Sequence, residues 1–146
     1  MINSKRNKMK PPKAPILIVD GFIKKDGKYL AIKRAKNVEV GTWETPGGKV
    51  ALNERVENAL RREIKEELGI NIKINKFLGW GEGLDCSTGY EFKIHRFVLY
   101  FDCEIISGDP KPDSNEVSEH KWITSEEFKK LKPLSKPIED FFKKFG

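Results

Sequence analysis

The segment RREIKEELGI, residues 61–70, places three glutamates within two turns of a predicted helix that ends at Gly69. These are Glu63, Glu66 and Glu67. Like charges three or four residues apart on a helix repel each other by roughly 0.2 to 0.5 kcal/mol per pair. Carboxylates in the last turn also face the negative end of the helix macrodipole. A chain that accepts this cost is constrained by something other than helix stability.

The face on which these acids lie indicates what the constraint is. The helix is predicted to begin near Asn53, a good N-cap residue, and to run to Leu68. At about 100° per residue, the apolar residues that should be buried share one face of this helix: Val56, Ala59, Leu60 and Ile64. Glu63 and Glu67 lie in the middle of the same face, and Glu66 lies at its edge. Two carboxylates therefore point toward the expected core.

Such carboxylates need a cation between them, because an unpaired charge is costly to remove from water. Oxygen ligands without a nearby histidine or cysteine suit Mg²⁺, or Mn²⁺ as a substitute, rather than Zn²⁺. The alternative is an ordinary surface helix stabilised by i, i+4 pairs, Glu57 with Arg61 and Arg62 with Glu66. The position of the acids on the apolar face and the glycine-rich loop before the helix count against that alternative.

Length and composition narrow the class of protein. The chain has 146 residues, which suits one domain with a true core. No apolar run approaches the roughly 20 residues of a membrane span, so we expect a cytoplasmic protein with no membrane partner. Residues 1–13 are expected to form a flexible basic tail, because no apolar segment of signal-peptide length follows them. Cys86 and Cys103 are expected to be buried thiols.

The net charge of +6 favours encounters with anions such as nucleotides or nucleic acid. The lysines are spread along the chain, without the interleaved aromatic residues of a platform for single-stranded nucleic acid. Nucleic acid is therefore not the favoured partner, although the charge does not rule it out.

Local patterns predict the remaining elements. Asp26-Gly27 joins two apolar, β-branched segments and predicts a β-hairpin. The first arm is apolar at residues 16–19, as in a strand that is covered on both faces. Thr124 and Glu127 have the spacing of a capping box. The other expected elements are a loop at 36–53, a strand at 70–80, a turn at 81–89, a strand at 90–105, a polar loop at 107–120, a short strand at 121–123, a helix at 125–131 and an amphipathic helix at 135–146.

Residues 48–70, GKVALNERVENALRREIKEELGI, resemble the sequence box of the Nudix hydrolase family, with every spacing kept. The matching residues are Gly48, Glu54, Arg62, Glu63, Ile64, Glu66, Glu67, Gly69 and Ile70. The preceding GTWETPGGKV also looks like the family's approach to this box, and the general pattern is similar to the MutT-like members. The resemblance covers about residues 14–145. It implies an α/β/α sandwich with a mixed central sheet, formed by a domain at 14–146.

The resemblance also implies roles for residues of the box. Glu63 and Glu67, with Glu66 as a further candidate, would bind the divalent metal together with the carbonyl of Gly48. Either Glu66 or Glu63 would act as the base that activates water. In the same way, Arg62 would orient the glutamates and Glu54 would brace the loop against the helix. The alternatives are a surface ion pair for Arg62 and a favourable N-terminal helix charge for Glu54.

Residues outside the box are candidates for substrate binding. Arg34, Lys49 and the backbone at Gly47 are placed to steady phosphates, and the alternative for both cations is solvated surface. In this family a later loop often adds a ligand. The acidic candidates here are Glu116, Glu119 and Glu82. The aromatic candidates for stacking on a base are Trp43, Trp80 and Phe92, each of which could equally belong to the core.

The function that the resemblance implies is Mg²⁺-dependent hydrolysis of the diphosphate linkage of a nucleoside triphosphate or another nucleoside diphosphate derivative, with release of a nucleoside monophosphate. ADP-ribose is the main competing substrate. Two further candidate functions are an RNA-directed pyrophosphohydrolase and a Nudix-fold sensing module without catalysis, although a module of that kind is expected to have a broken box. The chain could also form a homodimer.

Overall fold

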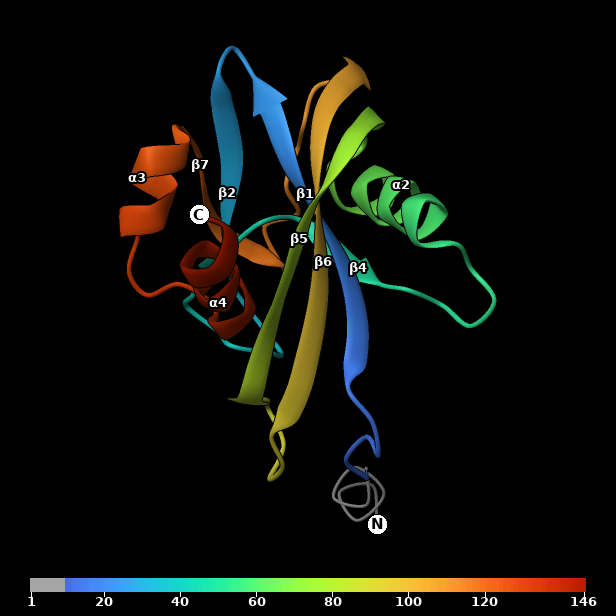
Figure 1. Cartoon of the computed structure of the whole chain (residues 1–146), viewed down its shortest axis with the longest axis vertical. Helices are drawn as coiled ribbons and strands as arrows, with labels where there is room; N and C mark the ends of the chain where they lie inside the picture. Colours follow the sequence, from blue (N-terminus) through green and yellow to red (C-terminus); the bar gives the residue numbers. More distant parts are fainter. Residues whose placement is uncertain (1–9) are drawn as a thin grey trace.

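The computed structural model describes residues 10–146, so most of the predicted N-terminal tail at 1–13 lies outside the described residues. The elements of the described part, in chain order, are β1 (Ile16–Lys25), β2 (Lys28–Arg34), β3 (Trp43–Glu44), β4 (Gly47–Lys49), α2 (Val56–Leu68), β5 (Asn71–Cys86), β6 (Ile94–Ser107), β7 (Val117–Ile123), α3 (Ser125–Lys130) and α4 (Lys136–Phe145). Figure 1 shows these elements as helices on both sides of one sheet.

The sheet is mixed, and its strands follow the order β3-β2-β1-β6-β5, with β4 paired to β1 and β7 paired to β2. The pair β1–β6 is parallel, and the other pairs are antiparallel. The predicted hairpin is confirmed, since Lys25 pairs with Lys28 across Asp26 and Gly27. Both turn residues have positive φ, 52° and 77°, as a two-residue hairpin turn requires.

The two faces of the sheet are covered by different helices. Helix α2 covers one face with its buried residues Ala59, Leu60, Ile64 and Leu68. Helices α3 and α4 cover the other face, where Phe128, Ile138 and Phe141 pack against β1 and β6 (Figure 1). The predicted α/β/α sandwich is therefore confirmed. Six consecutive residues of β1, 18–23, are buried, as expected of a strand with both faces covered.

The start of α2 differs from the prediction. Asn53 has a φ of 63° and is not the N-cap; the helix begins at Val56, and Arg55 occupies the N-cap position without a side-chain cap. In the loop before the helix, the Glu54 carboxylate accepts a hydrogen bond from the backbone N–H of Ala51 at 3.0 Å, and this bond closes a turn within the loop. The predicted end at Gly69 is confirmed, because Gly69 has a φ of 73° and its N–H donates to the carbonyl of Lys65.

Three segments expected to be irregular are strands. The loop at 36–53 contains β3 and β4, residues 81–86 extend β5, and residues 117–120 belong to β7. Two of the glycines that suggested a turn at 81–89, Gly81 and Gly83, pack against the start of α4: a Cβ on Gly81 would lie 1.9 Å from the carbonyl oxygen of Pro137. Strand pairing and helix packing therefore overrode the local turn composition.

The capping box at the start of α3 is confirmed. The Thr124 hydroxyl accepts from the N–H of Glu127 at 3.2 Å, and the Glu127 carboxylate accepts from the N–H of Thr124 at 2.9 Å. We expect Thr124→Ala to lower the free energy of unfolding by about 1 kcal/mol. Ser135, at the N-cap of α4, makes no capping bond, so Ser135→Ala is a matched control and should change stability little. Urea denaturation measures both, and equal losses in the two variants would contradict the prediction.

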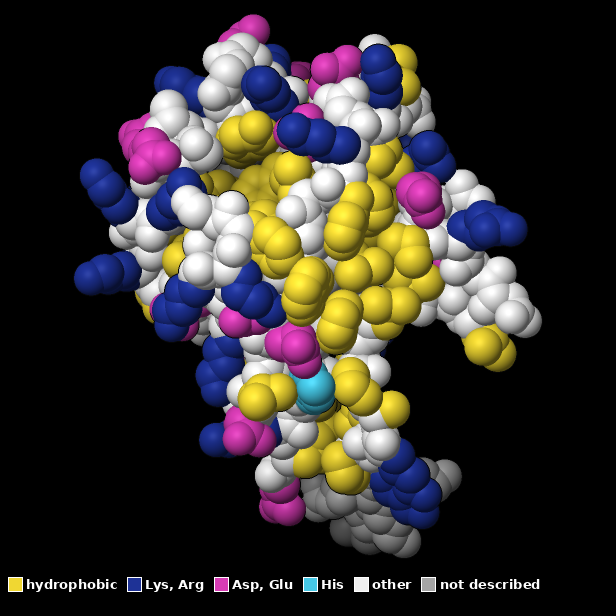
Figure 2. Space-filling view, in the orientation of Figure 1, with side chains coloured by type: hydrophobic (Ala, Val, Ile, Leu, Met, Phe, Trp, Pro, Cys, Tyr) yellow, Lys and Arg dark blue, Asp and Glu magenta, His cyan; other side chains and the backbone are white. Residues whose placement is uncertain are grey.

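Hydrophobic side chains gather on the surface around β5 and α4 (Figure 2). Phe77, Trp80 and Phe145 are exposed there, and the ring centroids of Trp80 and Phe145 lie 5.0 Å apart. Among residues 10–146, no helix is long and apolar enough to cross a membrane. The homodimer stays a prediction.

Candidate active site

A cleft of about 460 Å³ brings the acids of α2 together with the loop that precedes the helix. Glu63, Glu66 and Glu67 line one end of this cleft, next to residues 47–49 of β4. The other end is lined by apolar residues of β1 and β6 and by Arg96. A cleft of this size suits a small-molecule ligand.

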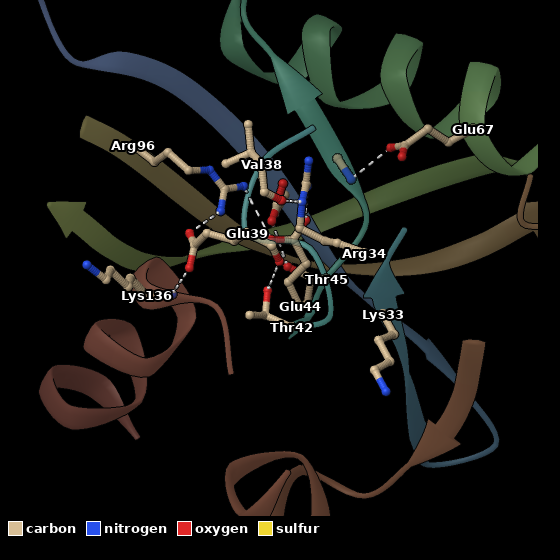
Figure 3. A network of polar contacts seen from close by, with 12 residues as sticks. Lys33, Arg34, Val38, Glu39, Thr42, Glu44, Thr45, Glu67, Arg96 and Lys136 are labelled. Atoms are coloured by element: carbon tan, nitrogen blue, oxygen red, sulfur yellow. Dashed lines mark hydrogen bonds and ion pairs between the residues drawn. The ribbon is translucent and has the colours of Figure 1, made fainter. Parts of the chain in front are cut away.

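Glu67 and Glu63 are the half-buried acids of the cleft. The N–H of Gly47 donates to the Glu67 carboxylate at 3.0 Å (Figure 3). Burial nevertheless raises the pKa of Glu67 to about 8, because one hydrogen bond does not replace the water that the carboxylate loses. Burial also raises the pKa of Glu63, although Arg62 offsets part of the effect. For Glu63 and Glu67, which the helical wheel placed toward the core, the nearby positive charge is therefore too small to offset the cost of burial.

Arg62 connects the helix to the loop before it. Its Nε and Nη2 donate to the two oxygens of Glu54 at 2.7 and 2.9 Å, and Nη2 also donates to the carbonyl of Lys49 at 3.1 Å. Its Nη1 donates to Glu63 at 3.1 Å and reaches Glu66 at 3.4 Å. The Arg62 hydrogen bonds, followed by that from Ala51, lower the pKa of Glu54 to about 2. One guanidinium thus holds the loop and the acids of α2 in a fixed relation.

Gly48 lies directly against Glu63. A Cβ at this position would come within 2.2 Å of the Glu63 carboxylate, so a larger residue fits only if the Glu63 side chain moves. We expect Gly48→Ala to displace Glu63 and lower kcat/KM by about tenfold to a hundredfold, the usual result of misplacing a reacting group by about an ångström. Steady-state kinetics measures the loss. Gly89→Ala is the matched control, since a Cβ there meets nothing within 4 Å; a similar loss in both variants would contradict the prediction.

The two predicted phosphate-binding cations, Lys49 and Arg34, both line the cleft. The Lys49 side chain is exposed. Arg34 is held in place, because its Nη1 donates to Glu44 at 2.6 Å and its Nε donates to the carbonyl of Val38. Arg34 therefore presents a fixed guanidinium, whereas Lys49 keeps its freedom to move.

The three acidic candidates from later in the chain differ in whether they line the cleft. Glu116 lines the cleft, forms an ion pair with Lys36 at 3.2 Å, and is joined by Asp113, which the sequence prediction did not include. Glu119 and Glu82 are not among the residues that line the cleft. Glu119 lies 3.7 Å from Lys33, and Glu82 lies 2.9 Å from His95. The structure thus brings Glu116, but neither of the other two, to the acids of α2.

None of the three candidate aromatic residues lines the cleft. Trp43 belongs to the core between the sheet and helices α3 and α4, Trp80 packs against Phe145, and Phe92 stacks on Tyr90 with ring centroids 5.4 Å apart. Trp43 is therefore a core residue, and the other two rings contact aromatic neighbours rather than a cleft ligand.

A buried network of charged side chains lies beside the cleft and was missed by the sequence prediction (Figure 3). Arg96 donates to Glu39 at 2.9 Å and to Glu44 at 3.3 Å. The Thr45 hydroxyl donates to Asp20 at 2.9 Å. A signal was present in the sequence: Arg96 alternates with the buried residues Ile94, Val98 and Tyr100, which places a guanidinium in an apolar row.

Two buried acids of this network have pKa values that shift in opposite directions. Burial and the nearby Glu44 raise the pKa of Asp20 well above its usual value. Burial also acts on Glu44, but Arg96 and Arg34 outweigh it and lower the pKa of Glu44. Glu44 is therefore a carboxylate held between two guanidinium groups, whereas burial and the nearby Glu44 disfavour the charged form of Asp20.

The chemistry of the site suits a hard divalent cation, although no group of three or more acidic, histidine or cysteine side chains within residues 10–146 is already gathered around one metal position. The side chains at the acidic end of the cleft offer oxygen ligands only, from Glu63, Glu66 and Glu67. The raised pKa values of Glu63 and Glu67 indicate that a cation would relieve their burial. The side chain of Glu66 is 59% exposed and has room to turn toward such an ion.

Comparisons with known proteins identify the family. The profile described as NUDIX domain matches residues 11–145. The nucleoside triphosphatase NudI of Escherichia coli O81 is 36% identical over 117 residues, which cover 75% of this chain and 82% of that protein. The crystal structure of a MutT NUDIX hydrolase from Burkholderia pseudomallei has a TM-score of 0.71 and 31% identity, covering 84% of this chain and 92% of that chain. The MutT protein from Methanosarcina mazei Go1 has a TM-score of 0.73 and 27% identity, covering 92% and 95%. The chain therefore belongs to the Nudix family and is MutT-like.

Proposed function

We propose that this protein hydrolyses the diphosphate linkage of a nucleoside triphosphate with the help of Mg²⁺, and releases a nucleoside monophosphate and pyrophosphate. As a Nudix hydrolase it acts on nucleotide pyrophosphate bonds. The observation that carries the finer proposal is the pair of half-buried acids, Glu63 and Glu67, facing a cleft that Arg34 and Lys49 also line. The relative named as a nucleoside triphosphatase supports the choice of substrate class.

The metal would be held by Glu63 and Glu67, with Glu66 and the carbonyl of Gly48 as further ligands. When bound, Mg²⁺ neutralises phosphate charge and lowers the pKa of a coordinated water. Arg34 and Lys49 would bind phosphate oxygens of the substrate, and the bond from Arg34 to Glu44 keeps the guanidinium oriented.

Proton transfer falls to a carboxylate at the mouth of the site. Glu66 is the more accessible candidate, because its side chain is 59% exposed and its contacts with Arg62 are long, at 3.4 Å. Glu63 is the alternative base, although Arg62 and Gly48 confine it. The water oxygen bonds to phosphorus, the bond from phosphorus to the bridging oxygen breaks, and the proton passes to the carboxylate. Arg62 and Glu54 act by positioning rather than by contact with substrate.

A substrate screen tests this function. The full chain is incubated with Mg²⁺ and each of four nucleoside triphosphates, ADP-ribose and dinucleotides, and the phosphate products are separated and identified. Nucleoside monophosphate and pyrophosphate from a triphosphate are the expected products. Exclusive cleavage of ADP-ribose would replace the proposed substrate, and no cleavage of any compound would overturn the enzymatic proposal.

The RNA-directed alternative has its own test. If the basic residues 1–13 anchor RNA, their deletion should weaken RNA binding and reduce the salt dependence of the binding that remains. We expect instead that the shortened protein keeps its activity on free nucleotides and that cleavage of 5′-triphosphorylated RNA is slow before and after the deletion. Rapid cleavage of RNA that depends on these residues would favour the alternative.

A further inference from the structure

Arg96 occupies the end of the cleft opposite the acids of α2. It is buried, with 4% of its side chain exposed, and it lines the cleft together with Ile16, Ile18 and Ile94. Besides these apolar residues, the buried acids Asp20 and Glu44 line the same cleft, and Glu44 accepts a hydrogen bond from Arg96. This is the arrangement of a pocket that encloses a flat ring and orients it by a small number of hydrogen bonds.

The guanidinium of Arg96 still has donors to offer. An arginine has five N–H groups, and those of Arg96 make one bond to Glu39 and one to Glu44. The Nε–H of Arg96 makes no hydrogen bond to an acceptor within residues 10–146, so it is a donor that a ligand in the cleft could use.

The charge of Arg96 is already balanced. Arg96 and Arg34 together face the carboxylates of Glu39 and Glu44, so this group of four carries no net charge. Arg96 therefore offers hydrogen-bond donors without an excess of positive charge, whereas the exposed Lys49, next to Gly48, adds a positive charge at the end of the cleft near α2. The N–H groups of Arg96 suit a neutral acceptor such as a carbonyl oxygen.

Strand register places Arg96 at a suitable distance from the metal end. Arg96 on β6 pairs with Ile16, and Gly48 on β4 pairs with Val19 on the opposite side of β1. Three residues along β1 and two strand spacings across it separate the two backbone positions by roughly 14 Å. This span leaves room for a sugar between a phosphate near Gly48 and a base near Arg96.

The network also has a cost that a structural role does not explain. Replacing buried ion pairs by apolar residues is often neutral or stabilising. Glu39 in addition holds a φ of 46°, which is unfavourable for a residue with a side chain, and is fixed there by Arg96 and by the N–H of Lys136 at 2.8 Å. Strain of this kind is usually retained where a side chain must be held for a ligand.

We propose that Arg96 is a specificity-determining residue that donates hydrogen bonds to a carbonyl oxygen of the nucleobase and so favours guanine, cytosine and uracil over adenine. Adenine carries no carbonyl group to accept these hydrogen bonds, and its amino group is itself a donor. The proposal rests on the proposed function, since it assigns the base of the same nucleotide substrate. It also disfavours adenine compounds, including ADP-ribose, as substrates.

The test compares substrates on the same protein sample, so that any unfolded fraction cancels from the ratio. For the wild type, kcat/KM for GTP, CTP and UTP should each exceed that for ATP by about tenfold or more. Arg96→Lys keeps the charge for Glu39 and Glu44 but loses the planar fork, and the preference should fall to about threefold or less. Arg61→Lys, on the exposed face of α2, is the matched control and should leave the ratio unchanged.

A binding measurement separates this inference from the proposed function. Calorimetry without metal should show tighter binding of GMP than of AMP to the wild type, and equal binding of the two to Arg96→Lys. Hydrolysis of all four triphosphates at equal rates would leave the proposed function standing and overturn the inference. If no triphosphate is cleaved, the proposed function fails, and the preference for GMP over AMP decides the role of Arg96. An unchanged ratio in Arg96→Lys would also overturn it.

Discussion

Glu67→Gln is expected to lower kcat by about a thousandfold while the fold stays intact, because the change removes charge but not volume. The N–H of Gly47 can still donate to the amide oxygen that replaces a carboxylate oxygen. What is lost is the anionic ligand for the metal, and an interaction of this kind is worth several kcal/mol in the transition state. Steady-state kinetics with saturating Mg²⁺ measures the loss. Glu57→Gln, on the exposed face of the same helix, is the matched control and should keep full activity.

The same substitution should raise the stability of the metal-free protein at alkaline pH. The pKa of Glu67 is about 8 in the folded chain against an ordinary value of 4.5, so the folded state binds its proton more tightly than the unfolded state. Wild-type stability from this group therefore falls as pH rises from 4.5 to 8. Glutamine has no such dependence. In EDTA, we expect the Tm of Glu67→Gln to exceed that of the wild type at pH 8, with a smaller difference at pH 5.

The activity of the same variant is a separate test. Near-normal hydrolysis by Glu67→Gln would show that the site is wrongly assigned.

Removal of the divalent cation should abolish hydrolysis altogether, and Mg²⁺ or Mn²⁺ should restore it. Without the ion, the cleft lacks the divalent charge that would neutralise the phosphates of the substrate, and burial is left to disfavour the charged forms of Glu63 and Glu67. The ion should also raise Tm, since a ligand that binds only the folded state stabilises it. Calorimetry with increasing Mg²⁺ measures this shift.

A matched variant makes the metal prediction specific. The increase in Tm with Mg²⁺ should be clearly smaller in Glu67→Gln than in Glu57→Gln, because only the first removes a proposed ligand. Full hydrolysis in excess EDTA, or the same increase in Tm for both variants, would contradict a metal site at these glutamates.

Predictions from the sequence were confirmed where a structural feature depends only on a few adjacent residues. The hairpin at Asp26-Gly27 and the capping box of Thr124 and Glu127 depend on a few adjacent residues, and both are present. The end of α2 at Gly69 was predicted for the same reason. The start of α2 was not, because Glu54 bonds to the loop and to Arg62 instead of leaving Asn53 to cap the helix.

The candidate site divides in the same way. The acids of α2 could be found from the helical period, since they share a face with the buried residues of one segment. Glu116 could not be preferred to Glu119 or Glu82, because the choice depends on how β7 pairs with β2 and how β5 pairs with β6. Asp113 was missed because it lies in a polar loop whose position is set by neither helical nor strand periodicity.

The sequence by itself determined that one helix turns its acids inward beside a glycine-rich loop, and this is the basis on which a cation site is predicted at that end of the molecule. The sequence is sufficient for this because residues three and four positions apart lie on the same face of a helix, whatever the rest of the chain does. The tertiary structure alone decided what faces those acids: β1, β4 and β6 bring Arg96 opposite Glu67 across one cleft, from segments far apart in the chain. Burial, which shifts the pKa of Glu67 and fixes Arg96 between Glu39 and Glu44, exists only once those segments have packed together.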